Sequence, residues 1–463
     1  MPEGVQRAAI ILAAGQGTRM KSVLPKVLHK VGGKALIDWA MDLAAALGCA
    51  RTIVVTGANA PDLHAAVASR LGEGAVAVQD PPRGTADAVK AAAAALADFS
   101  GDVVILYGDA PLIRPQTVSA LFELRAERNG VAALGFEALD PTGYGRLILA
   151  EDGSVARIVE ERDANDAERA VTLCNSGVLV ADKAVLFQLL SMVGNANAKG
   201  EFYLTDIVGL GRSAGFKTHV VEAEEDEVLG VNSREELAEA EAAFQFRSRL
   251  AALEAGVTLI DPDTVYFSHD TAIANDVVIE PNVFFGPGVT VKSGALIHAF
   301  CHFERAEIGE NAEIGPFARF RPGAKLARKV KIGNFVEVKN SNLAEGVKAN
   351  HLAYIGDADV GARSNLGAGT ITCNYDGFDK SRTTIGEDVF IGSDTALVAP
   401  VTIGDRAYTA AGSVVTDDVK PGALAIARGR QAEIDGWADA FREKKRAQKA
   451  AKAAAKASKD AAE

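Results

Sequence analysis

The chain has 463 residues, which is enough for two or three domains because single hydrophobic cores stop growing below this length. Hydrophobic residues make up 48% and charged residues 24%, as in an ordinary soluble globular protein. The formal net charge of −12 argues against nucleic acid as a partner, since proteins that bind it usually carry a basic face. Apolar runs stay shorter than a membrane span, so we expect no membrane partner and a cytoplasmic location.

Up to about residue 230, short apolar runs alternate with helical patterns. The apolar runs are AAIILAAG, RTIVVTG, AVAVQD and DVVILYGDAPL, and the helices are expected at 35–47, 61–71 and 85–97. This alternation predicts an α/β domain of βαβ units, with helices on both faces of a largely parallel sheet. The later runs RLILAEDGSVARIVEER and CNSGVLVAD are expected to add mixed strands. Ligands on such a sheet bind at the carboxyl ends of its strands, where AAGQGTR, QDPPRGTAD and YGDAPL follow.

Residues 233–256 are predicted to form a connecting helix, because Ser233 is followed three residues later by Glu236, as in a capping box. After Val257 the period changes to six. The aliphatic or aromatic residues at this spacing are Ile273, Ile279, Phe285, Val291 and Ile297, then Ile308, Ile314 and Phe320, then Ile385, Ile391, Leu397 and Ile403. A hexapeptide repeat predicts a left-handed parallel β-helix, here over residues 257–440.

The remaining segment, 441–463, is rich in Lys and Ala. We expect it to be a solvated, frayed helix or a disordered end, and a nucleic-acid or membrane arm is the alternative.

The glycine loop after the first strand, Gly15-Gln16-Gly17, fits two well-known phosphate loops poorly. A dinucleotide loop would need a third Gly where Met20 stands, and a triphosphate loop would need GK[ST]. The loop could be a mere turn, but its backbone N–H groups could also cradle phosphates at a helix start. Arg19 and Lys26 follow it, and two cations beside such a cradle suit transfer at phosphorus.

Asp109 ends a hydrophobic strand in YGDAPL. A carboxylate at this edge could hold Mg²⁺ together with substrate oxygens, or it could only cap the following segment. The residue alone leaves both interpretations open.

The hexapeptide period is interrupted by polar clusters between about 338 and 384, whereas a purely structural coil would need none. His351 lies in one of them, three residues before Tyr354. An imidazole there could accept the proton of an amine during acyl transfer from a thioester, or it could be structural.

The motifs LAAGQGTRM, LPKVLH, RGTADA, YGDAPL, PTGYGR, IVEERDA, CNSGV and GVNSREEL resemble, in order and spacing, those of sugar-1-phosphate nucleotidyltransferases. They are most similar to the uridyltransferase half of the bifunctional N-acetylglucosamine-1-phosphate uridyltransferase/glucosamine-1-phosphate acetyltransferases. The resemblance covers roughly residues 7–440. It implies a Rossmann-like nucleotidyltransferase domain with a mixed sheet over residues 1–232, and a homotrimer formed through the β-helix.

The resemblance also implies the N-terminal site. The positions that match residues binding UTP or UDP-N-acetylglucosamine are Leu12, Ala13, Ala14, Gly15, Lys26, Gln79, Gly84, Thr85, Tyr107, Gly108, Asp109, Gly145, Glu160, Asn175 and Asn232. Asp109 and Asn232 match Mg²⁺ ligands, while Arg19 and Lys26 would stabilise the charge as N-acetylglucosamine 1-phosphate attacks the α-phosphorus of UTP. Some members of the family have His where this chain has Asp87, which leaves a role for that side chain in doubt.

The C-terminal segment resembles the acetyltransferase half of the same family. His351 matches the general base, and Glu337 would orient the amine or that base. The positions that match sugar-phosphate contacts are Arg321, Lys339, Tyr354 and Asn365. Those that match acetyl-CoA contacts are Ala368, Asn374, Tyr375, Ser393, Ala411 and Arg428.

The resemblance therefore implies an enzyme that acetylates glucosamine 1-phosphate with acetyl-CoA and couples the product to UTP, giving UDP-N-acetylglucosamine for peptidoglycan and lipopolysaccharide precursors. Two alternatives remain open at this stage. One is a monofunctional nucleotidyltransferase with a structural β-helix, and the other is a nucleotide-sugar sensor without catalysis.

Overall fold

The computed structural model describes residues 5–15 and 17–460, so Gln16 of the glycine loop lies outside the described residues. The chain divides into two compact units, Met1–Lys329 and Val330–Glu463. Each is described by itself. None of the helices within the described ranges is both long and apolar enough to cross a bilayer.

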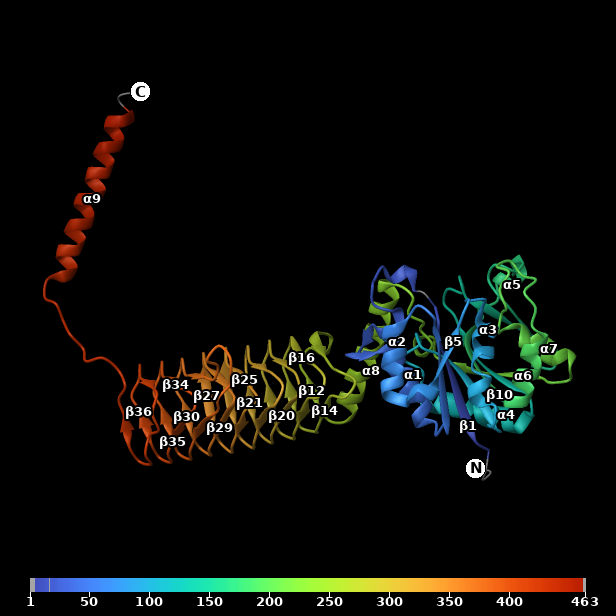
Figure 1. Ribbon diagram of the computed structural model, residues 1–463, viewed down its shortest axis with the longest axis horizontal. Coiled ribbons are helices and arrows are strands. Elements are labelled where there is room, and N and C mark those ends of the chain that lie inside the picture. Colours follow the sequence, from blue (N-terminus) through green and yellow to red (C-terminus); the bar gives the residue numbers. More distant parts are fainter. Residues whose placement is uncertain (1–4, 16, 461–463) are drawn as a thin grey trace. The chain divides into compact units, whose positions relative to one another are not determined.

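The first unit begins with a mixed β-sheet whose strands are joined mainly by helices (Figure 1). The strands are β1 (Arg7–Ala13), β4 (Arg51–Gly57), β5 (Val76–Gln79), β6 (Asp102–Tyr107), β7 (Val131–Glu137), β8 (Gly145–Leu149), β9 (Val155–Val159), β10 (Leu173–Asp182) and β11 (Thr218–Ala223), in the order β5-β4-β1-β6-β10-β7-β11-β9-β8. A short hairpin of β2 (Lys30–Val31) and β3 (Lys34–Ala35) stands apart from this sheet. The helices are α1 (Leu36–Ala46), α2 (Pro61–Leu71), α3 (Thr85–Ala91), α4 (Pro115–Arg128), α5 (Asp166–Arg169), α6 (Lys183–Met192), α7 (Asp206–Ser213) and α8 (Arg234–Glu254).

The strands β5, β4, β1 and β6 are parallel, as the βαβ pattern predicted. β10 then pairs antiparallel with both β6 and β7, and β8 pairs antiparallel with β9, so the mixed strands expected from the later runs are confirmed. The third predicted helix is shorter than expected: α3 ends at Ala91, and a separate 3₁₀ turn follows at Ala94–Leu96.

Strand β1 explains why its sequence is apolar without alternation. Ala8, Ile10 and Leu12 belong to one buried cluster with α3, α6 and α7, whereas Ala9 and Ile11 belong to another with α1, α2 and α4. A strand covered on both faces needs apolar side chains at every position. The carboxyl end of β1, where the glycine loop begins, is thereby anchored in two cores.

The 21-residue helix α8 begins as its sequence predicted. The Ser233 side chain accepts from the Glu236 N–H, and the Glu236 carboxylate accepts from the Ser233 N–H at 3.1 Å. This capping box satisfies donors that would otherwise lack partners at the start of a helix.

The rest of the first unit is a run of short parallel strands. They are β12 (Thr258–Leu259), β13 (Val265–Tyr266), β14 (Ala272–Ile273), β15 (Val278–Ile279), β16 (Val283–Phe285), β17 (Thr290–Val291), β18 (Leu296–Ile297), β19 (His302–Phe303), β20 (Ala306–Ile308), β21 (Glu313–Ile314), β22 (Arg319–Phe320) and β23 (Ala324–Leu326). Each pairs with the third strand along, as in β12-β15-β18-β21, so three ladders form the sides of a parallel β-helix.

The second unit consists of further coils of the same kind, followed by a helix, and is drawn in orange to red in Figure 1. Its elements are β24 (Lys331–Asn334), β25 (Glu337–Lys339), β26 (Asn342–Leu343), β27 (Lys348–His351), β28 (Tyr354–Gly356), β29 (Ala358–Val360), β30 (Asn365–Leu366), β31 (Ile371–Cys373), β32 (Thr383–Ile385), β33 (Phe390–Ile391), β34 (Ala396–Val398), β35 (Val401–Ile403), β36 (Tyr408–Thr409), β37 (Val414–Val415), β38 (Leu424–Ala425) and α9 (Trp437–Asp460).

The six-residue period marks the residues that fill the coils. All the predicted positions from Ile279 to Ile403 are buried, and only Ile273, in the first coils, is half-buried. The predicted architecture, an α/β domain with a mixed sheet followed by a parallel β-helix, is confirmed.

Candidate functional sites

The glycine loop that follows β1 packs against the segment that carries Lys26. Gly17 has a φ of +59°, and a Cβ on it would stand 2.6 Å from Cβ of Lys26. Both the backbone angle and the close approach require glycine. At Gly15, by contrast, a Cβ would meet nothing within 4 Å.

Lys26, Asp109 and Asn232 come together although they are far apart in the sequence. Lys26 Nζ forms an ion pair with Asp109 Oδ2 and donates to Asn232 Oδ1 at 2.9 Å. The side chains of Lys26 and Asp109 are only 11% and 17% exposed. The Val231 N–H donates to the Asp109 carbonyl at 2.8 Å, which fixes the two segments to each other. A carboxylate and a carboxamide oxygen thus converge on one cation.

Arg19 lies beside this group on a 3₁₀ turn, Thr18–Met20, and its side chain is 66% exposed. Its guanidinium is 3.6 Å from Glu236, which also accepts from the N–H groups of Asn232 and Ser233. The predicted cation Arg19 and the predicted ligand Asn232 therefore share one carboxylate. Sequence reasoning identified Glu236 only as a helix cap and missed this contact.

A cavity of about 280 Å³ opens beside the glycine loop. Its lining includes Ala13, Ala14, Gly15, Lys26 and Gln79, all of which the sequence placed at the nucleotide site.

Gly84 and Thr85 begin α3 close to residues 202–204. Gly84 has a φ of +119°, and a Cβ on it would lie 2.5 Å from the Phe202 carbonyl oxygen. Thr85 Oγ1 accepts from the Leu204 N–H at 2.9 Å. These contacts fix the backbone turn that leads from β5 into α3.

Tyr107 ends β6, Glu160 directly follows β9, and Asn175 lies near the start of β10. Burial raises the pKa of the Glu160 carboxyl, and a hydrogen bond from Thr205 Oγ1, 3.0 Å long, offsets only part of this. Burial, with the charges of Glu160 and Asp109, also raises the pKa of the Tyr107 hydroxyl, which stays protonated.

The strands β8 and β10 place Gly145 directly opposite Asn175 in an antiparallel pair. Asn175 Oδ1 accepts from the Gly177 N–H at 3.1 Å. Gly177 has a φ of +91°, and a Cβ on it would stand 2.5 Å from the Tyr107 ring. The predicted binding positions Tyr107, Gly145 and Asn175 thus lie close together. Gly108 joins them to the end of β1, since its N–H donates to the Leu12 carbonyl at 3.0 Å.

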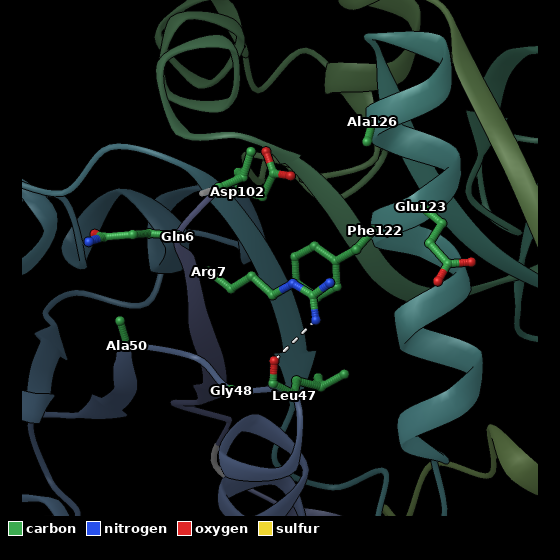
Figure 2. A pocket seen from close by; sticks show the side chains of 10 residues that line it. Gln6, Arg7, Leu47, Gly48, Ala50, Asp102, Phe122, Glu123 and Ala126 are labelled. Atoms are coloured by element: carbon green, nitrogen blue, oxygen red, sulfur yellow. Dashed lines mark hydrogen bonds between the residues drawn. The ribbon is translucent and has the colours of Figure 1, made fainter. Parts of the chain in front are cut away.

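A larger cavity, of about 690 Å³, lies at the opposite ends of β1 and β6 (Figure 2). There the Arg7 guanidinium stacks on the Phe122 ring at 4.4 Å and donates to the Leu47 carbonyl at 3.2 Å. Asp102 is paired with Arg125 at 3.0 Å. Arg7 and Asp102 are thus engaged in internal contacts, and the cavity lies where β1 and β6 begin. We therefore assign the nucleotide site to the smaller cavity at the strand ends.

In the second unit, His351 is paired with a residue one coil earlier. β24 and β27 place Asn334 directly beside His351, and His351 Nδ1 lies 3.0 Å from Asn334 Oδ1. An amide oxygen only accepts, so Nδ1 carries the proton, and in the neutral imidazole Nε2 then keeps its lone pair. Sequence reasoning missed Asn334, which stands in the polar segment GNFVEVKNS.

The register of the coils aligns His351 with three of the predicted acetyl-CoA positions. Successive coils pair Ala349, Leu366, Ile391 and Thr409 in register. Two positions after each of these, in the same order, come His351, Ala368, Ser393 and Ala411. They form one column along a corner of successive coils. Arg428 lies at the same corner, since its Nη1 donates to the Ala411 carbonyl at 2.8 Å.

A second polar group surrounds Asp357. Burial opposes ionisation of this carboxyl, but hydrogen bonds from Asn340 and Asn374 and the charges of Lys339 and Lys380 together lower its pKa. The nearby ammonium group of Lys339 lowers the pKa of Lys380, because two like charges repel each other. Two ammonium groups therefore lie close together, as at a site for an anion.

Sequence reasoning missed Lys380 and Asp357. Lys380 ends the interruption NYDGFDK, so the position could have been found there. Asn374 Nδ2 lies 3.5 Å from Tyr354 Oη, which joins these two predicted residues to the group around Asp357.

The remaining predicted positions are Asn365, Glu337, Tyr375 and Arg321. Asn365 pairs in register with Phe390, and Glu337 pairs in register with Tyr354. Tyr375 is 59% exposed. Arg321 directly follows β22 and belongs to the first unit.

Comparison with known proteins identifies both halves of the chain. Residues 9–172 match the family model of the MobA-like NTP transferase domain, and residues 382–417 match that of the bacterial transferase hexapeptide (six repeats). A protein of Maricaulis maris named "Bifunctional protein GlmU" is 58% identical over 442 residues, which are 96% of this chain and 97% of that protein. Proteins of the same name from Caulobacter vibrioides and Cereibacter sphaeroides are each 55% identical, over 96% and 95% of this chain and 96% of each relative.

The family resemblance found in the motifs is thus confirmed over nearly the whole chain. It excludes the interpretation of the chain as a nucleotidyltransferase with a merely structural β-helix, because the relatives are bifunctional by name over their full length. The chain therefore belongs to the family of bifunctional GlmU proteins, enzymes that combine a uridyltransferase and a glucosamine-1-phosphate acetyltransferase.

Proposed function

We propose that the two activities occupy separate regions of the chain. Uridylyl transfer would take place within residues 1–232 and acetyl transfer within residues 257–440, with residues 233–256 as a helical connection and 441–463 as a tail. Acetyl-CoA and glucosamine 1-phosphate would react first, and the product would then attack UTP.

The observation that carries the first assignment is the convergence of Lys26, Asp109 and Asn232 at the carboxyl ends of β1 and β6. In the proposed reaction an oxygen of the N-acetylglucosamine 1-phosphate phosphate attacks the α-phosphorus of UTP, and pyrophosphate leaves. Lys26 and Arg19 would neutralise the charge that builds up on the phosphate oxygens. The backbone after β1 would line the nucleotide, together with Tyr107, Glu160 and Asn175.

The oxygens of Asp109 and Asn232 would also hold Mg²⁺. They are hard oxygen donors, which suit this ion, and they already converge on a single cation, the Lys26 ammonium. Among the described residues no cluster of three His, Cys, Asp or Glu side chains could hold a metal, which fits an ion bound mainly by substrate oxygens. Bound there, Mg²⁺ would stabilise negative charge on the phosphates.

For acetyl transfer, His351 would take the proton from the attacking amine of glucosamine 1-phosphate. Asn334 holds the Nδ1–H, so the unprotonated Nε2 is the basic atom. Lys339, together with Lys380, would bind the sugar phosphate, and Tyr354 and Asn365 would complete that site. The column of Ala368, Ser393 and Ala411, with Asn374, Tyr375 and Arg428, would contact acetyl-CoA.

We further propose a cytoplasmic homotrimer formed through the β-helix. Exposed rings stack along one side of the coils, with centroids 6.2 Å apart for Tyr266 and Phe284 and 4.9 Å apart for Phe284 and His302. Such exposed aromatic surface favours packing between subunits. Sedimentation equilibrium gives the subunit number directly, and a monomer at assay concentrations would contradict the trimer.

One coupled assay tests the whole assignment. The protein is given glucosamine 1-phosphate, acetyl-CoA, Mg²⁺ and each of the four NTPs, and both thiol and pyrophosphate release are followed. We expect thiol release with any NTP but pyrophosphate only with UTP. Lys26→Ala should reduce only pyrophosphate release, by about 10²–10³-fold as for loss of one charge-stabilising donor. Equal loss of both signals in this variant would contradict two separate sites.

A further inference from the structure

The amide of Gln79 is held in one orientation by two neighbours. Its Nε2 donates to the Gly84 carbonyl at 3.0 Å and to Asp87 Oδ2 at 3.0 Å. A carbonyl and a carboxylate oxygen only accept, so the NH₂ end of the amide must face them. Gln79 is 6% exposed and lines the 280 Å³ cavity, which leaves its amide little freedom to turn.

The orientation leaves Gln79 Oε1 as the free atom of the amide. No donor within residues 5–15 and 17–460 uses it, and the Gly84 N–H has no acceptor in the same ranges. An unused acceptor and an unused donor thus belong to two residues that are already linked by a hydrogen bond. This pair matches the uracil edge, where N3–H donates and O4 accepts, whereas cytosine presents an N3 acceptor and an amino donor.

Asp87 is itself held in place. It lies in the first turn of α3, where the helix dipole favours a carboxylate, and its side chain is 15% exposed. Arg83 Nη2 donates to Oδ1 at 3.0 Å while Oδ2 accepts from Gln79. Asp87 Oδ1 thus contacts Arg83, and Asp87 Oδ2 accepts from the Gln79 amide.

We propose that Asp87 is a positioning residue for base selection, which holds the Gln79 amide so that its oxygen accepts from N3–H of uracil and its NH₂ cannot serve N3 of cytosine. The proposal rests on the proposed binding of UTP at this cavity. Without Asp87 one acceptor for the amide is lost, and the flipped amide, with Nε2 toward the base, becomes accessible. Discrimination against CTP should then weaken.

The test compares three variants of the full chain. Asp87→Leu removes the acceptor, Asp87→Asn keeps an acceptor but not the charge, and Arg83→Ala removes the ion pair while leaving the acceptor. The kcat and KM for UTP and CTP are measured by pyrophosphate release, and thermal unfolding is followed for each variant.

For Asp87→Leu we expect the KM for UTP to rise and the ratio of kcat/KM for UTP over CTP to fall, each about tenfold, as for loss of one hydrogen bond to the base. The kcat for UTP should stay within about a factor of two, because the reacting phosphate is not touched. Asp87→Asn should restore most of the ratio, and Arg83→Ala should keep it.

An unchanged ratio in Asp87→Leu would overturn the proposal. An equal fall of the ratio in Asp87→Leu and Asp87→Asn would also overturn it, since this would point to the charge of Asp87 and not to its acceptor oxygen. If Asp87→Leu does not fold, the folded Asp87→Asn variant still tests the proposal. A fall of about tenfold in its ratio of kcat/KM for UTP over CTP would contradict the proposal in the same way. Failure of the wild-type chain to use UTP at all would instead contradict the proposed function.

Discussion

His351 and Asn334 occupy equivalent positions on adjacent coils, with Nδ1 and Oδ1 3.0 Å apart. The parallel register of the β-helix, and not proximity in sequence, therefore sets the tautomer of the proposed base. A residue 17 positions away decides which ring nitrogen is free.

We predict that His351→Ala lowers kcat for acetyl transfer by about 10²–10⁴-fold, as for loss of a general base. Asn334→Leu should lower it less, by about tenfold, because the base remains but its tautomer is no longer fixed. Thiol release from acetyl-CoA measures both. Uridylyl transfer from added N-acetylglucosamine 1-phosphate serves as the control and should not change, and wild-type acetyl transfer by His351→Ala would refute the assignment.

The two glycines of the first loop should respond differently to alanine. Gly17→Ala places a Cβ 2.6 Å from Cβ of Lys26 at a φ of +59°, so we expect a loss of about 1–3 kcal/mol in the free energy of unfolding. Uridylyl transfer should fall with it, because Lys26 must move. Gly15→Ala meets no atom within 4 Å and should leave the unfolding midpoint unchanged. Denaturant unfolding of the two variants tests this difference. Equal unfolding midpoints would show that the loop imposes no such constraint at Gly17.

The half-buried Glu160 makes a pH-dependent contribution to stability. Because burial raises its folded-state pKa above the unfolded value, the folded chain binds the proton more tightly, and stability falls as pH rises through the interval between the two. Glu160→Gln keeps an acceptor for Thr205 but removes this dependence. We expect the variant to have the higher thermal midpoint at neutral pH and the same midpoint as wild type below about pH 4. A lower midpoint for the variant at neutral pH would contradict the stated cause.

Lys380 should contribute to phosphate binding in acetyl transfer. Since Lys339 lies close enough to lower the pKa of Lys380, an anion between the two would relieve their repulsion. Lys380→Ala should raise the KM for glucosamine 1-phosphate about tenfold, with a smaller effect on kcat. The exposed Lys420 provides the matched control, Lys420→Ala, which should behave as wild type. A KM that is unchanged in Lys380→Ala would remove this residue from the site.

The parts of the fold that depend on periodicity could be predicted from the sequence. The repeat at Ile385, Ile391 and Ile403 follows from the need to fill each coil, and the capped start of α8 follows from Ser233 and Glu236. Contacts such as that between Lys26 and Asn232 could not be derived from spacing, because 206 positions separate them and only the closed fold brings them together. The resemblance supplied the residues of the site, but not their partners.

The missed residues show the same limit. Asn334, Lys380 and Asp357 act through neighbours one coil away, and the register of the coils is set by loop lengths that no local pattern reveals. Asp87 had no evident role until its two acceptor oxygens could be matched to Gln79 and Arg83.

The register pairs Leu366 with Ile391, 25 positions apart, whereas Ala349 pairs with Leu366 at 17 and Ile391 pairs with Thr409 at 18. The longer coil contains the loop 374–382, whose ends are joined by a Ser381 N–H to Asn374 carbonyl bond of 2.9 Å and by a bridge between Tyr375 and Lys380. The coils on either side continue in register, so this loop can vary in length and sequence without disturbing them. Evolution, or a protein engineer, could therefore change what the site binds while the ladder that carries His351 stays the same.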